Sequence, residues 1–137
     1  METKILVVDD EEGITSSLVR YFSLMGYDVT STNDPERALE MIYQENYMVV
    51  ISDIMMPGMS GTELLVRIKQ YNGMIQVIMM TGVVTIENVL KCLRHGANEC
   101  FLKPLDDLES MKKSVDEAIE KLNKWENLIK SMVRRKA

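Results

Sequence analysis

The hydrophobic positions of this chain gather into four short, mostly apolar runs: Ile5–Val8, Met48–Ile51, Ile75–Met80 and Cys100–Leu102. These runs lack the alternation of apolar and polar residues that a half-exposed strand shows. Such runs are typical of strands covered on both faces. A weaker and more polar run, Tyr27–Ser31, suits a strand at the edge of the same sheet.

The segments between these runs have apolar residues at intervals of three and four, which predicts helices. Asp34 followed by Pro35 is typical of a helix start. Residues 60–63, Ser-Gly-Thr-Glu, form a capping-box pattern, and Gly96 predicts the end of a helix. Strand and helix therefore alternate along the chain.

This alternation, with short connections, predicts an α/β fold with right-handed crossovers and a parallel sheet between two layers of helices. Five strands in a chain of 137 residues suit a flavodoxin-like, doubly wound (βα)5 fold with strand order 2-1-3-4-5. The order is an analogy, since the sequence gives alternation and not spatial arrangement. An extended C-terminal helix follows.

Length and composition indicate one globular domain, with 46% hydrophobic and 27% charged residues. We find no signal-peptide pattern and no run long enough to span a bilayer, so we expect a cytoplasmic protein without membrane contact. Cys92 and Cys100 have neither disulfide nor zinc spacing, and we interpret them as reduced, buried residues.

The net charge of −5 is unevenly distributed, because the last 17 residues are basic and the rest of the chain is acidic. A basic tail is compatible with nucleic-acid binding. However, the chain shows no second, groove-entering module and only Trp125 as an interleaved aromatic residue, so we expect a solvated helix surface and no direct nucleic-acid binding.

Polar residues follow four of the expected strands, where ligands bind in open α/β sheets. They are Asp9 and Asp10, Asp53, Thr81 with Gly82, and Lys103 with Pro104. Each alone has a structural explanation, such as a helix cap or a surface charge. Together, four strand ends that supply acidic residues twice, a hydroxyl and an ammonium predict a phosphoryl-acceptor site.

Three carboxylates at one edge of an apolar core repel one another unless a cation lies between them. Mg²⁺ suits this set, because few carboxylates are offered and positions remain for water and a phosphoryl oxygen. Asp53, on the central strand, is the expected nucleophile. We expect Lys103 to pair with one phosphoryl oxygen and Thr81 to donate its hydroxyl to another.

Five motifs at consistent spacing make residues 4–120 resemble the receiver domain of two-component response regulators. They are residues 5–11 (Ile-Leu-Val-Val-Asp-Asp-Glu), Asp53 with the loop from Met56 to Gly61, Thr81-Gly82, Gly96-Ala97 and Lys103-Pro104.

The resemblance implies that a histidine kinase phosphorylates Asp53 and that the domain assists its own phosphorylation and dephosphorylation without being a true enzyme. It implies that Asp10, Asp53 and the backbone carbonyl of Met55 ligate Mg²⁺, with Asp9 acting through water. Thr81 and Lys103 would then shift a surface of helix four, strand five and helix five that binds an output domain, a partner protein or a second copy.

The chain departs from this family at one position: Cys100 stands where the family usually has an aromatic switch residue, and Phe101 should face the other side of its strand. The resemblance therefore does not imply coupling through an aromatic ring at this position. Met55 and Val83, two residues after Asp53 and Thr81, are apolar and predict slow self-dephosphorylation.

A heptad seam predicts a last helix from about residue 105 to residue 134, with residues 1–120 as the receiver domain and 121–137 as an extension. The first half should cover the sheet, whereas Leu122, Trp125, Ile129 and Met132 should need another partner. That partner is a coiled-coil dimer or a linker to an output domain. A helix folded back on its own domain, or a frayed tail, remains the alternative.

Three other functions share parts of this pattern. A metal-dependent phosphatase would need a second acid or base beside the nucleophile, where Ile54 and Met55 stand. A flavin-binding electron carrier would need a phosphate loop in place of the acidic residues 9–12. A binding module that works without phosphorylation is the strongest alternative, and Cys100 favours it.

Overall fold

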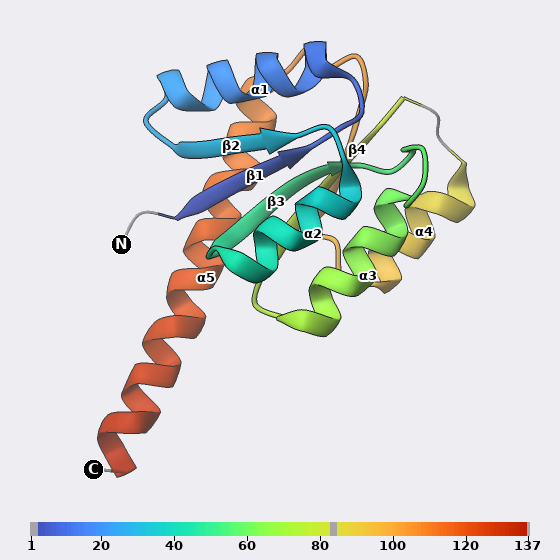
Figure 1. Cartoon of the computed structure of the whole chain (residues 1–137). Coiled ribbons are helices and arrows are strands. Elements are labelled where there is room, and N and C mark those ends of the chain that lie inside the picture. The colour runs from blue at the N-terminus through green and yellow to red at the C-terminus, as the bar shows by residue number, and fades with distance from the viewer. Residues whose placement is uncertain (1–2, 83–84, 137) are drawn as a thin grey trace.

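The computed structural model describes residues 3–82 and 85–136 and contains a five-stranded sheet in the order β2-β1-β3-β4-β5 (Figure 1). All four strand pairs are parallel, as predicted. The elements are β1 (Lys4–Val8), α1 (Glu12–Leu24), β2 (Asp28–Thr32), α2 (Pro35–Gln44), β3 (Tyr47–Asp53), α3 (Gly61–Tyr71), β4 (Gln76–Thr81), α4 (Ile86–Arg94), β5 (Glu99–Leu102) and α5 (Leu108–Lys136).

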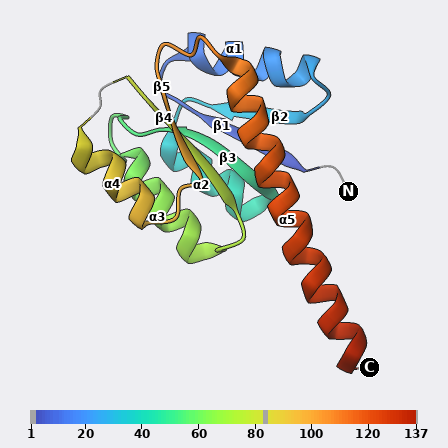
Figure 2. The same cartoon turned by 180° about the vertical axis from the view of Figure 1, so that it is seen from behind.

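Helices cover both faces of the sheet, and each face has its own apolar core. On one face, α2, α3 and α4 pack against alternate strand residues such as Leu6 and Val50. On the other face, α1 and α5 pack against the residues between them, such as Val7 and Ile51. Figures 1 and 2 show these two layers from opposite sides. Burial on both faces explains why the strand sequences are continuous apolar runs.

The predicted helix ends are formed, with one difference. The Asp34 side chain accepts a hydrogen bond from the backbone N–H of Glu36, and Pro35 opens α2. Ser60 caps α3 by accepting from the N–H of Glu63 at 3.2 Å. In a full capping box the Glu63 side chain would bond back to the N–H of Ser60. Here the Glu63 carboxylate pairs instead with Arg67 at 3.0 Å.

Strand β5 separates its two central side chains, as the sequence predicts. Cys100 packs on the face that carries α2, α3 and α4, whereas Phe101 packs on the face that carries α1 and α5. Both cysteines are free thiols; Cys92 is buried and Cys100 is half-buried. Burial raises the pKa of both thiols, which keeps them protonated.

Helix α5 has two halves with different environments. Met111, Val115 and Ala118 are buried against the sheet, which confirms the expectation for the first half. The prediction for Leu122 was wrong: it is 1% exposed and belongs to the same core, because the helix still covers the sheet one turn further than expected. Trp125, by contrast, is 50% exposed.

The second half of α5 projects beyond the rest of the chain (Figures 1 and 2). Its exposed apolar residues are Trp125, Leu128, Ile129, Met132 and Val133. Within the described part of the chain, this helix, like the others, lacks the length of apolar sequence that a membrane crossing requires.

Candidate functional site

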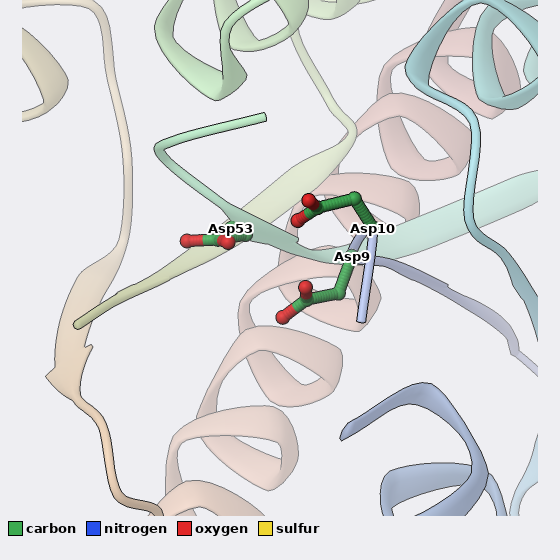
Figure 3. A group of neighbouring side chains, drawn as sticks. All are labelled: Asp9, Asp10 and Asp53. Carbon is green, nitrogen blue, oxygen red and sulfur yellow. The ribbon is translucent and has the colours of Figure 1, made fainter. Parts of the chain in front are cut away.

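Three carboxylates converge at the carboxyl ends of β1 and β3. Asp9 and Asp10 follow β1, and Asp53 ends β3, the strand paired with β1. Each offers an oxygen within 4.8 Å of the others (Figure 3). Asp9 and Asp53 are buried, whereas Asp10 is exposed. Hard oxygen ligands in this number could hold a divalent cation.

Asp9 is held in place through both its side chain and its backbone. Its Oδ1 accepts a hydrogen bond from the N–H of Glu11 at 2.9 Å, and its carbonyl accepts one from the Asn33 side chain at 2.8 Å. Its buried Oδ2 finds no hydrogen-bond partner among the described residues. Burial raises the pKa of Asp9, although Lys103 and the N–H of Glu11 oppose that effect.

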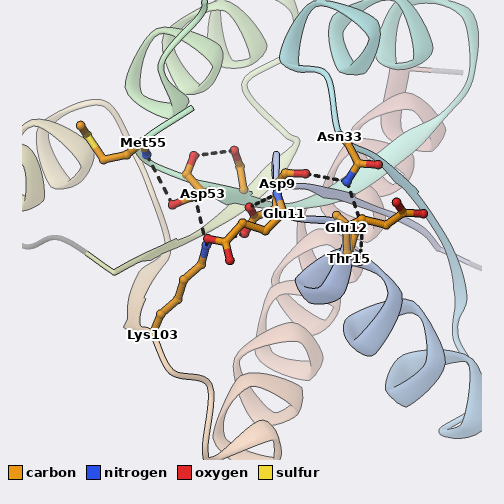
Figure 4. Close-up of polar contacts among 9 residues, drawn as sticks. Asp9, Glu11, Glu12, Thr15, Asn33, Asp53, Met55 and Lys103 are labelled. Atoms are coloured by element: carbon orange, nitrogen blue, oxygen red, sulfur yellow. Dashed lines mark hydrogen bonds and ion pairs between the residues drawn. The ribbon is translucent and has the colours of Figure 1, made fainter. Parts of the chain in front are cut away.

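Lys103, the residue directly after β5, bridges the carboxylates of Asp9 and Asp53 (Figure 4). Its Nζ lies 2.6 Å from Asp9 Oδ2, 3.1 Å from Asp53 Oδ2 and 3.4 Å from Glu11 Oε1. The contact with Asp9 is a close ion pair, so the Lys103 ammonium is the partner of this buried oxygen. One ammonium faces three carboxylates, and the cluster keeps an excess of negative charge. A second positive charge near Asp9 would therefore be stabilised.

The charge of Lys103 is secure in this setting. Burial alone would lower its pKa, but its contacts with the negatively charged carboxylates of Asp9 and Asp53 outweigh that effect and raise it. The lysine thus remains an ammonium at neutral pH. An ammonium that already lies beside the Asp53 carboxylate is well placed to contact any anionic group added there.

The loop after Asp53 is packed tightly against the start of α3. Gly61 donates its N–H to the carbonyl of Ile54 at 2.8 Å, and a Cβ at Gly61 would lie only 1.8 Å from the carbonyl oxygen of Asp53. A side chain at position 61 is therefore excluded by the backbone of Asp53 itself. The N–H of Met55 also donates to Asp53 Oδ1, at 3.4 Å.

Thr81 ends β4 beside this cluster and is buried. Its carbonyl accepts a hydrogen bond from the N–H of Lys103 at 2.8 Å, which ties the end of β4 to the lysine. Gly82 follows, and a Cβ there would make only ordinary contacts with the Lys103 side chain, the nearest at 3.8 Å. The packing of described atoms therefore does not require glycine at this position.

All the site residues predicted from the sequence lie in this region, and two further residues support them. Asn33, directly after β2, donates to the Asp9 carbonyl and to the Thr15 hydroxyl. The rule that singled out polar residues after the strands would also have found Asn33. Gly61 was predicted only as part of a cap and of a family motif, because a close approach between two backbones leaves no signal in the sequence.

Of the two positions expected to control water access, Met55 and Val83, only Met55 is among the described residues. The Met55 side chain is 52% exposed and lies beside Asn88. Val83 lies outside the described residues, so the expectation of slow self-dephosphorylation remains a prediction.

Comparisons with known proteins agree with this fold and this cluster. The response regulator receiver domain family matches residues 5–124. Sporulation initiation phosphotransferase F of Bacillus subtilis is 35% identical over 106 residues, which cover 77% of this chain and 86% of that protein. The chain therefore belongs to the response regulator receiver domain family.

Solved structures show the same similarity. A CheY-like receiver domain protein from Methanospirillum hungatei superposes with a TM-score of 0.84 at 28% identity, covering 90% of this chain and 99% of that one. The beryllofluoride-activated NtrC4 receiver domain dimer gives 0.81 at 30% identity, covering 87% and 98%. Several curated relatives are longer, and the chain spans between 22% and 52% of their length.

Receiver domains are regulatory parts of two-component systems, where they interact with histidine kinases and output domains. They are not classical enzymes.

Proposed function

We propose that Asp53 accepts a phosphoryl group from a histidine kinase and that the modified domain then binds an output domain or a partner protein in the cytoplasm. The observation that carries this proposal is the position of Asp53. Its buried carboxylate lies 3.1 Å from the Lys103 ammonium and within 4.8 Å of two further carboxylates. A nucleophile, a cation-binding cluster and a fixed positive charge are thus combined in one site.

Asp9, Asp10, Asp53 and the backbone carbonyl of Met55 are the proposed Mg²⁺ ligands, with Asp9 acting through water. The excess of three carboxylates over the one ammonium that bridges them supports this choice, as does the all-oxygen donor set. When bound, Mg²⁺ would offset the negative charge of the carboxylates and of the incoming phosphoryl oxygens.

In the proposed transfer, a carboxylate oxygen of Asp53 forms a bond to phosphorus while the bond between phosphorus and the kinase histidine breaks. Lys103 contacts a phosphoryl oxygen, since its Nζ already lies beside Asp53 Oδ2. Thr81 donates its hydroxyl to another. Because the Lys103 N–H is bonded to the Thr81 carbonyl, movements of the two residues are coupled.

The surface of α4, β5 and α5 is the proposed output, and a homodimer through it is the proposed assembly. Several apolar side chains on this surface are exposed, including Ile86 at 78% and Leu93 at 68% on α4 and Leu102 at 61% on β5. The similarity to a receiver that is dimeric when activated supports the same use here. We propose residues 1–120 as this receiver unit, to which the buried Leu122 adds the next turn of α5.

A second candidate is a binding module that works without phosphorylation. Cys100 favours it, because no aromatic ring occupies the position from which the family usually reports phosphorylation. The chemistry of the acidic cluster opposes it, because a binding module needs neither three convergent carboxylates nor a lysine that bridges them.

Incubation with a small phosphodonor and Mg²⁺, followed by intact mass measurement, separates the two candidates. We expect one added phosphoryl group on the native chain and none on Asp53→Asn. Asp34→Asn is a matched control, because Asp34 caps α2 outside the site, and it should be labelled like the native chain. If the native chain gains no mass, the phosphoacceptor proposal is wrong.

A further inference from the structure

We propose that the exposed end of α5 pairs, antiparallel, with the same segment of a second copy of this chain. The tip of each helix then lies against the base of the other copy's body, which is the end where strands β1 and β3 begin. The paired segment, called the α5 extension, is residues 123–136, and the body is the part of the chain before it. This inference goes beyond the proposed function and does not depend on phosphorylation of Asp53.

The α5 extension carries an apolar stripe without a partner in its own body. Trp125, Leu128, Ile129, Met132 and Val133 are between 46% and 65% exposed. They are spaced as one face of a helix, and so large an apolar stripe on a projecting helix marks an interaction surface. Figure 2 shows this segment below the sheet, clear of the other helices.

The direction of the stripe limits how two copies can meet. Met111, Val115 and Leu122 face the sheet, and Trp125, Ile129 and Met132 continue the same heptad spacing. Such a seam drifts by only about 20° per heptad on a straight helix. The stripe therefore lies on the side of the helix where the chain's own body sits.

This geometry disfavours a parallel pair. If two extensions packed their stripes together in parallel, both bodies would have to occupy the space between the two helices at the same height. In an antiparallel pair, the bodies lie at opposite ends. The two extensions then pack side by side between them, and the two-fold symmetry closes the assembly of the unphosphorylated chain at a dimer. The homodimer through α4, β5 and α5 proposed above belongs to the phosphorylated domain.

The charges support contact between the tip of one copy and the body of the other. Residues 123–137 hold five of the 16 Lys and Arg but one of the 21 Asp and Glu, so residues 1–122 retain 11 basic and 20 acidic residues and a net charge of −9. The opposite net charges of the extension and the body favour the approach of two copies over a distance. The attraction does not come from the groove beside Trp125, which is lined by Lys69 and Lys121.

The base of the body offers grooves on both sides of the helix where the tip would arrive. One groove, of ≈ 380 Å³, lies between Met48 in β3 and Asn127 in the extension. The other, of ≈ 350 Å³, lies between Met74 before β4 and Trp125. Side chains at the tip of the partner's helix can enter these grooves, which join the exposed stripe to the body.

The association itself is tested by sedimentation velocity of the full chain from micromolar to millimolar concentration. We expect a monomer–dimer equilibrium that weakens at least about tenfold in Ile129→Asp. Leu24→Asp is the matched control, since Leu24 is 76% exposed on α1, and it should leave the association unchanged. A monomer at every concentration, or equal weakening by Leu24→Asp, would overturn the proposal.

The direction is tested by the distance between spin labels on Lys113→Cys in a chain carrying Cys92→Ala and Cys100→Ala. Lys113 is exposed on the first half of α5. Antiparallel extensions place the two labels about 50 Å apart, at 1.5 Å per residue, whereas parallel helices 8–10 Å apart place them within about 20 Å. The short distance contradicts the proposal, and so does binding to anionic lipid vesicles by a chain that stays monomeric.

Discussion

The acidic site and the α5 extension differ in whether their side chains find partners within the chain. At the acidic site, Asp53 is 4% exposed and Lys103 bridges it to Asp9. In the α5 extension, Ile129 is 46% exposed although it stands in the same seam as the buried Leu122. The comparison teaches that one region is arranged to receive a small ligand within a fixed frame, whereas the other presents a surface to a macromolecule.

The largest effect is expected at the acidic site when divalent cations are removed. Chelation should slow phosphoryl labelling by at least about 100-fold. Without a divalent cation, the charge of Lys103 alone would offset the negative charge of three carboxylates and of the incoming phosphoryl group. The rate is measured by intact mass against time. A chelator saturated with Mg²⁺ beforehand is the control, and an unchanged rate with free chelator would rule out the cation role.

The two halves of α5 should respond differently to truncation of a single side chain. Leu122→Ala should lower the free energy of unfolding by about 3 kcal/mol, because it opens a cavity in the core. Ile129→Ala should lower it by less than about 1 kcal/mol in dilute solution, where the chain is monomeric. Urea unfolding monitored by circular dichroism gives both values. Equal losses would mean that the two halves do not differ as described.

The frame around Asp53 should be sensitive to one added methyl group. Gly61→Ala should cost about 2 kcal/mol of folding stability and slow labelling, because the new Cβ overlaps the Asp53 carbonyl. Gly13→Ala is the matched control in α1, where no described atom lies within 4 Å of the new Cβ, and it should stabilise by about 0.5 kcal/mol. Denaturant unfolding of both variants measures the difference, and a neutral Gly61→Ala would show that the loop can shift freely.

The smallest effect is expected where α5 is fastened to the start of β2. Tyr27 donates a hydrogen bond to Asp116, and Lys112 pairs with Asp116 at 2.9 Å. Burial opposes ionisation of Asp116, but these two contacts lower its pKa below 3.8. A lowered folded-state pKa stabilises the fold above the unfolded value, and this contribution disappears as the pH falls through the folded value.

Asp116→Asn should therefore cost about 0.5 kcal/mol at neutral pH, a small value because the side chain is 46% exposed. The difference from the native chain should vanish in acid, below pH 3.8. Thermal unfolding at several pH values measures it, with the exposed neighbour Glu117→Gln as the control. A cost that persists in acid would assign the effect to packing and not to charge.

The sequence predicted the fold and the members of the acidic site because both depend on repeating signals. Continuous apolar runs identify buried strands, and parallel strands bring the residues that follow them to one edge, so Asp9, Asp53 and Lys103 could be placed together. No repeating signal in the sequence shows how far along α5 the sheet covers the helix. Leu122 and Trp125 are neighbouring positions of the same seam, and only the extent of the sheet decides which one is buried.

Close contacts with the backbone could also not be predicted from the sequence. Gly61 is required by the approach of Asp53, a residue eight positions earlier, and this depends on how the loop folds back. The bond from Asn33 to the Asp9 carbonyl likewise depends on the relative height of β1 and β2.

The most direct test of the central claim is to locate the modified residue. After treatment with a phosphodonor and Mg²⁺, borohydride reduces an aspartyl phosphate to homoserine, and peptide mass mapping then identifies the changed position. The account predicts conversion at Asp53 alone, with Asp9 and Asp10 unchanged in the same sample. Conversion at Asp9 or Asp10, or at no aspartate, would contradict it.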